Sequence, residues 1–136
     1  MADMNKDKNK LIGLKLKIRS FFHQAYFRSH IVIWLLALSM VSNAANWIIL
    51  MVWIKPVDFP IILHYNVYFG VDLIGGYGQV YLLPLIGLIL FIINLILSIY
   101  FYKQKERIAS YILLMAMLMI QLSLIVASIS VILINY

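Results

Sequence analysis

Three long stretches without a charged side chain dominate this chain of 136 residues, and they cover residues 31–54, 80–102 and 108–134. A stretch of about 18 such residues is long enough to cross the roughly 30 Å hydrocarbon core of a bilayer as a helix. Charged residues make up 12% of the chain, whereas a typical soluble domain has about 25%. The sequence therefore predicts an all-α integral membrane protein with three transmembrane helices in a membrane domain covering residues 31–136.

The first 30 residues are basic and differ in composition from the rest of the chain. From residue 11 to residue 28 a helical projection places apolar side chains on one face and basic or polar side chains on most of the other. This pattern is typical of an amphipathic helix that lies in the membrane interface and binds anionic lipid. We expect four basic residues to contact the lipid surface: Lys15, Lys17, Arg19 and Arg28. Docking onto a partner subunit or an acidic cytosolic protein is the alternative.

The net charge of +6 comes mostly from this N-terminal segment. We therefore attribute the charge to lipid binding and topology and expect no nucleic-acid partner. Basic residues in short loops stay on the cytoplasmic side of a membrane, and ten of the eleven Lys and Arg residues lie either before residue 31 or between residues 103 and 107. This distribution predicts a cytoplasmic N-terminus and an external C-terminus. The heavy use of Ile, Lys and Asn is typical of AT-rich bacterial genomes, which indicates a bacterial inner membrane.

Each predicted span carries polar side chains on one helical face. Four of them are amides that we expect to make interhelical polar contacts: Asn43, Asn46, Asn94 and Gln121. Interhelical hydrogen bonds of this kind stabilise membrane bundles by about 0.6 kcal/mol on average. No Asp, Glu, Lys, Arg or His lies within a span, although proton relays and ion-coupled carriers usually need one. Structural contacts are thus the first interpretation, and a hydrophilic path or a small-ligand site is the alternative.

The connection between the first two spans, residues 55–79, is long and rich in aromatic residues, so we expect an ordered outer loop. Its residues 61–69 are β-prone and are bounded by Pro60 and Gly70, which favours a short extended segment or a hairpin. The loop is expected to fold over the outer end of the bundle and to bury its aromatic side chains against the helices or the lipid headgroups. Pro84 is expected in the first turns of the second span, where its missing N–H costs little.

Part of this loop resembles a known family. His64, Tyr65 and Asn66 are followed by Gly70 and Asp72 and, in the next span, by a leucine and Pro84. This order is similar to that in the Sdp-type immunity and signalling membrane proteins of bacteria. The resemblance covers about 30 residues and implies a small membrane protein with an immunity, sensing or regulatory role.

The chain has no cysteine, which excludes disulfides, thiolate catalysis and cysteine-ligated metals. It also lacks the nucleophile, phosphate-binding and dinucleotide-binding signatures of common enzymes. We therefore predict no enzyme activity, no cofactor and no metal site. The outer-loop candidates are His64, Asn66 and Asp72. Histidine changes charge near neutral pH and histidine with carboxylates can ligate zinc, so a pH or metal sensor remains an alternative.

These observations predict a small non-catalytic accessory, scaffold or immunity-type membrane protein that acts through its helix faces and its outer loop. Three helices leave much apolar surface exposed, so we expect a homo-oligomer or a subunit of a larger membrane complex. An oligomeric channel or small carrier is the alternative from a different functional class.

Overall fold

The computed structural model describes residues 25–135 and divides the chain into two units, Met1–Trp34 and Leu35–Tyr136. In the first unit a short helix, α2 (Ala25–Arg28), precedes the first residues of α3 (His30–Trp53). Arg28 ends α2. The rest of the predicted interfacial helix, with Lys15, Lys17 and Arg19, lies outside the described residues.

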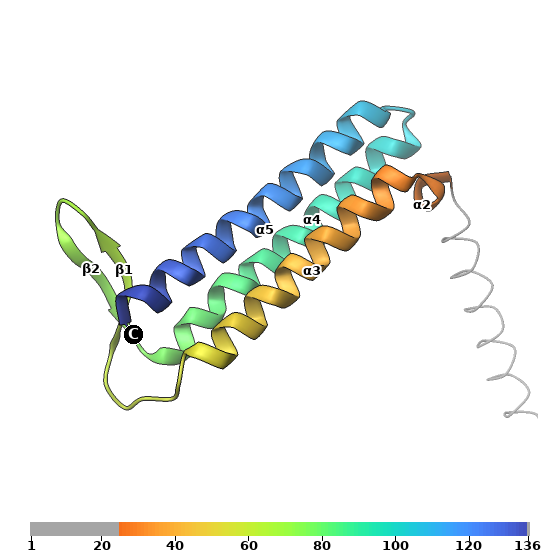
Figure 1. Cartoon of the computed structure of the whole chain (residues 1–136). Coiled ribbons are helices and arrows are strands. Elements are labelled where there is room, and N and C mark those ends of the chain that lie inside the picture. The colour runs from red at the N-terminus through yellow and green to blue at the C-terminus, as the bar shows by residue number, and fades with distance from the viewer. Residues whose placement is uncertain (1–24, 136) are drawn as a thin grey trace, which may run out of the picture. The chain divides into compact units, whose positions relative to one another are not determined.

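Within the described residues, three helices are long and apolar enough to cross a membrane. They are α3, then α4 (Leu82–Lys103) with the 3₁₀ helix η1 (Tyr77–Tyr81) before it, and α5 (Arg107–Asn135). The bounds of these helices agree with those of the predicted spans to within three residues at each end. α4 and α5 form an antiparallel pair joined by a tight turn, in which Lys105 adopts a positive φ of 67°. The part of α3 that belongs to the second unit lies beside this pair (Figure 1).

Buried positions in α3 and α5 recur mostly at alternating spacings of three and four residues. In α3 they include Ser39, Asn43, Asn46 and Leu50, and in α5 they include Ser110, Leu114, Met117, Gln121, Ser128 and Val131. An average spacing of 3.5 residues keeps one seam of a helix facing its neighbours, as in left-handed helix bundles. The other faces of these helices are apolar and exposed, which is the arrangement expected of helices surrounded by lipid.

The loop between α3 and η1 forms a two-stranded antiparallel hairpin of β1 (Ile61–Asn66) and β2 (Gly70–Gly75). The predicted extended segment is thus a strand. The structure is mostly helical but not all-α as expected, because it also contains this small sheet. The turn between the strands is held by Asn66, whose Oδ1 atom accepts a hydrogen bond from the backbone N–H of Tyr68 at 2.9 Å. Gly70 follows with a φ of +78°, a conformation that glycine adopts without a Cβ clash.

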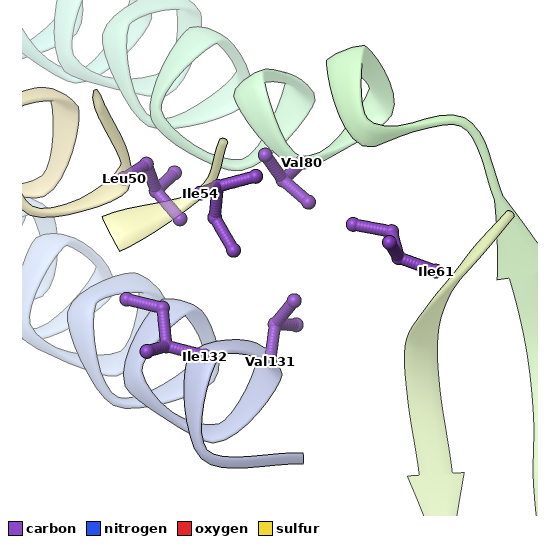
Figure 2. Close-up of a cluster of buried hydrophobic side chains, with 6 residues drawn as sticks. All are labelled: Leu50, Ile54, Ile61, Val80, Val131 and Ile132. Carbon is purple, nitrogen blue, oxygen red and sulfur yellow. The ribbon is translucent and has the colours of Figure 1, made fainter. Parts of the chain in front are cut away.

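The base of the hairpin packs on the helices, whereas its tip does not. Ile61 is buried in a small apolar cluster with residues from α3, from the residue that follows α3, from η1 and from α5 (Figure 2). Its other members are Leu50, Ile54, Val80, Val131 and Ile132. At the tip, Val67, Tyr68 and Phe69 are 85%, 91% and 85% exposed. Of the two expected positions for the loop aromatics, burial against the helices does not hold at the tip, because the hairpin extends sideways past the end of α5 (Figure 1). Burial against the lipid headgroups stays a prediction.

Candidate functional site

The centre of the bundle contains a connected group of amides and backbone carbonyls. The Nδ2 atom of Asn43 on α3 donates to Oε1 of Gln121 on α5 at 3.1 Å and to the carbonyl oxygen of Pro84 on α4 at 2.9 Å. The Nε2 atom of Gln121 donates to the carbonyl oxygen of Gly87 at 2.7 Å. These three bonds join all three helices. Water is absent from a hydrocarbon core, so polar groups there need partners within the protein.

Gly87 makes this arrangement possible because it has no side chain. A Cβ atom at this position would lie 2.8 Å from Oε1 of Gln121, 2.9 Å from Nδ2 of Asn43 and 2.9 Å from Cδ1 of Leu124. Contacts this short do not occur between real Cβ atoms and their neighbours. Gly87 therefore allows both amides to approach α4, and its own carbonyl accepts one of their bonds.

The other two amides of the predicted set do not join this group. Asn94 is half-buried and donates to the carbonyl of Leu90 on its own helix at 2.9 Å. Asn46 is 1% exposed, yet neither of its side-chain polar atoms has a hydrogen-bond partner among the described residues. The hydroxyls of Ser39 and Ser128 are also buried without a partner there. Spacing alone placed all four amides on inward faces, but the rotation and register of the helices decide which of them meet.

Two further polar contacts were missed by the sequence analysis. Ser98 and Ser110 lie next to each other near the α4–α5 turn, with their Oγ atoms 2.7 Å apart. At the other end of the bundle, the Oδ1 atom of Asn135 accepts from the backbone N–H of Ile62 at 2.9 Å, and its Nδ2 atom donates to the carbonyl of Ile62 at 2.7 Å. The Asn135 amide thus pairs with β1 as a neighbouring strand would. Its only sequence signal was a polar residue at the end of the third span.

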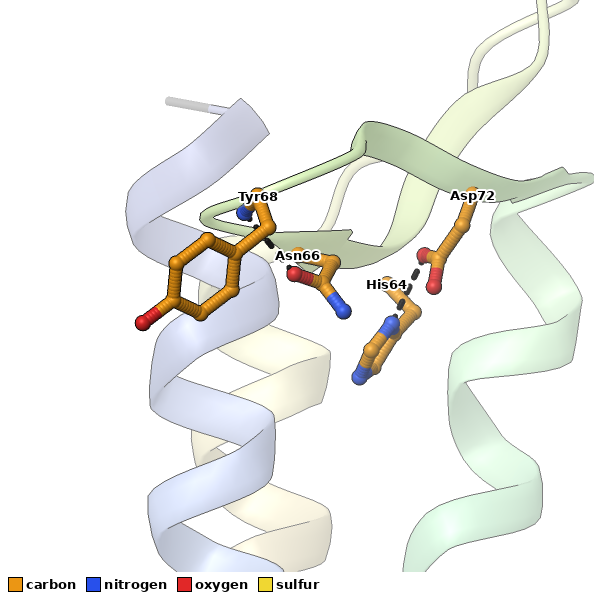
Figure 3. Close-up of polar contacts among 4 residues, drawn as sticks. All are labelled: His64, Asn66, Tyr68 and Asp72. Atoms are coloured by element: carbon orange, nitrogen blue, oxygen red, sulfur yellow. Dashed lines mark hydrogen bonds and ion pairs between the residues drawn. The ribbon is translucent and has the colours of Figure 1, made fainter.

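The outer-loop candidates lie together on the hairpin (Figure 3). The Nδ1 atom of His64 on β1 is 2.7 Å from Oδ1 of Asp72 on β2, and their side chains are 63% and 42% exposed. The strand register shifts on both sides of His64, and such irregularities change the direction of side chains. Asn66 bonds within the turn and not to this pair. Residues 25–135 contain no cluster of three or more potential metal-ligating His, Cys, Asp or Glu residues.

No protein-family model, curated protein or solved structure matches this chain. The resemblance of the loop to Sdp-type proteins therefore stays a prediction from the sequence. The geometry itself supplies two features that bear on function. The amides of Asn43 and Gln121 are buried between the helices, and the hairpin carries exposed aromatic side chains at one end of the apolar helices.

Proposed function

We propose that this chain is a small non-catalytic membrane protein of the accessory, scaffold or immunity type. It acts by binding other membrane components through its exposed helix faces and its hairpin. The observation that carries this proposal is the bonding of Asn43 and Gln121 within the bundle, because amides bonded to each other and to backbone carbonyls are not free to bind a solute. We therefore assign the function to the exposed helix faces and the hairpin and not to the bundle interior.

The surface offers extensive contact area to partners. Apolar side chains are exposed along all three helices, as at Ile48, Ile96 and Met119. Helices in lipid associate through close packing and not through the hydrophobic effect, so a protein partner or a second copy of the chain would bind these faces by fitting their shape. The immunity-type assignment depends on the loop resemblance, whose His64 and Asp72 form a pair on the hairpin. A cytoplasmic N-terminus bound to anionic lipid completes the proposal.

The test is a gentle detergent extraction of the tagged chain at native expression level, with mass identification and quantification of co-purifying proteins. Two variants remove candidate surfaces while leaving the interior intact: Ile96→Trp on the exposed face of α4, and Tyr68→Ser at the hairpin tip. The proposal predicts a stoichiometric partner, another protein or a further copy, whose recovery falls in at least one variant. A chain that purifies alone as a monomer in several mild detergents and in native membranes would contradict it.

An oligomeric channel or carrier is the second candidate, and one specific observation favours it. Asn46, Ser39 and Ser128 have buried polar atoms without a partner in the described part of the chain, and polar groups in membrane interiors often mark pathways. Gln121→Leu, at a bonded amide, and Asn46→Leu, at an unpartnered one, distinguish the two functions. A path lined by these amides predicts that either change abolishes solute flux in proteoliposomes while assembly survives. The surface proposal predicts no specific flux in the wild type and a loss of stability for Gln121→Leu alone.

A further inference from the structure

The hairpin is attached firmly at its base and is free at its tip. Ile61 is buried against the helices, and Asn135 makes two hydrogen bonds to the backbone of Ile62. The turn is also ordered, because Asn66 bonds to the Tyr68 N–H and Gly70 provides the positive φ. The three residues of the turn, Val67-Tyr68-Phe69, which we name the tip, lie between these features and contact little of the protein.

The direction of the hairpin places the tip at the level of the helix ends. Figure 1 shows the strands extending sideways from the end of α5, across the direction of the helices and not along it. The same end of the bundle carries Trp53, which is 58% exposed, and Tyr77 at the start of η1. Exposed Trp and Tyr residues at helix ends mark the membrane–water interface.

We propose that the tip inserts into the headgroup region of the bilayer that surrounds the helices, so that the hairpin binds the lipid surface through Val67, Tyr68 and Phe69. The chemistry of the tip matches this partner, since no residue from 65 to 71 is charged and amphipathic aromatic rings favour the headgroup level. The polar residues His64, Asn66 and Asp72 lie on the strands beside it, where water and headgroups can solvate them.

Lipid is a better match for the tip than a protein partner is. A stable protein interface buries roughly 800 Å² on each partner, and three side chains at the end of a narrow hairpin offer far less than this. Interfacial insertion needs no such continuous surface, because its strength follows the apolar area that leaves water. This inference concerns the hairpin alone and holds whether or not the helix faces bind a protein.

The absence of cysteine makes the test direct, because a single introduced cysteine gives a single labelling site. The full-length Val67→Cys variant carries an environment-sensitive fluorophore and is reconstituted at high lipid-to-protein ratio into vesicles of phosphatidylcholine and phosphatidylglycerol. Fluorescence is quenched either by nitroxide on the lipid chains near the headgroup or by iodide in the water. Asp58→Cys, which is exposed in the same loop, is the matched aqueous control, and Ile96→Cys is the lipid control.

We expect lipid quenching at position 67 to be severalfold stronger than at position 58, iodide quenching to be severalfold weaker, and the emission to shift to the blue. The variant with Tyr68→Ser and Phe69→Ser in the Val67→Cys background lacks both aromatic residues. Its lipid quenching and its iodide quenching should return to those of the aqueous control. Equal iodide access at positions 67 and 58 would overturn the proposal. Protection from iodide without lipid quenching would also overturn it, because it would mean that a second copy covers the tip.

Because these vesicles contain no other protein, the result is independent of any co-purifying partner. A negative quenching result would contradict the lipid-bound tip and would not affect the proposed accessory function. A chain that purifies without partners would contradict the accessory function and would not affect the lipid-bound tip.

Discussion

The bundle interior and the hairpin tip differ in the side chains that they bury: the interior buries polar amides, and the tip exposes aromatic rings. In the interior, Asn43 and Gln121 are almost fully buried and hydrogen-bonded. At the tip, Tyr68 and Phe69 are almost fully exposed. A water-soluble domain of this size would usually do the reverse, because water solvates amides and disfavours exposed aromatic rings.

The solvent around each region explains the difference. Hydrocarbon offers no hydrogen-bond partners, so an amide within a span is best placed between helices, where other amides and backbone carbonyls can bond to it. The hairpin lies beyond the ends of the spans, where its strand edges and polar side chains can meet water or headgroups. Interior substitutions should therefore change the stability of the whole bundle, and hairpin substitutions should act locally.

The largest effect is expected for Gly87→Ala. The new methyl group would meet Gln121, Asn43 and Leu124 at once, so the two amides must move and their bonds to α4 weaken. Overpacking in a filled interior costs about 1–3 kcal/mol, and we expect a loss of about 2 kcal/mol in the free energy of unfolding, measured by detergent-induced unfolding in bicelles.

Gly78→Ala is the matched control, because no atom lies within 4 Å of a Cβ built at that position. It should change the free energy of unfolding by less than about 0.5 kcal/mol. Equal effects of the two substitutions would show that the interior is not packed around Gly87, and the contrast between the two regions would then fail.

A smaller and local effect is expected for Asn135→Leu. This change leaves the N–H and the carbonyl of Ile62 without their side-chain partner. A typical hydrogen bond contributes about 1 kcal/mol, which corresponds to roughly fivefold faster hydrogen exchange at the Ile62 amide. NMR in micelles measures the hydrogen-exchange rate of the Ile62 amide. The exchange rates of amides in the middle of α4 and α5 should stay unchanged. Ser130→Ala, on the exposed side of the same helix, is the control and should leave the Ile62 rate unchanged.

The smallest effect is expected for His64→Ala. The His64–Asp72 pair is short but exposed, and exposed ion pairs contribute about 0–1 kcal/mol. We expect the free energy of unfolding to change by less than about 0.5 kcal/mol, with a coupling near zero in a double-mutant cycle with Asp72→Asn. A pH- or metal-dependent response of the wild type that disappears in His64→Ala would instead support the sensor interpretation.

Much of the architecture could be predicted from the sequence because membrane spans depend on local composition. Residues 31–54, 80–102 and 108–134 are each apolar over a length that fits the bilayer, and no tertiary contact is needed to recognise them. The β-prone segment after Pro60 was recognisable in the same way, from β-branched and aromatic residues between a proline and a glycine.

The pairing of particular side chains was not predictable in this way. Asn94 and Gln121 both occupy the middle part of a span, yet Asn94 bonds to its own helix and Gln121 bonds to two others. The contact of Asn135 could not be predicted from the sequence, because its partner is the backbone of Ile62, 73 residues away. Contacts of this kind depend on the rotation and register of helices, which composition does not encode.

By itself, therefore, the sequence determined the three helices, their lengths and the presence of an extended segment between the first two. Only the tertiary structure decided which amides meet around Gly87 and that the hairpin tip is left exposed. The physical reason is that a span requires only enough apolar length to match the bilayer, whereas a hydrogen bond between helices requires both partners to lie within about 3 Å of each other with the correct orientation.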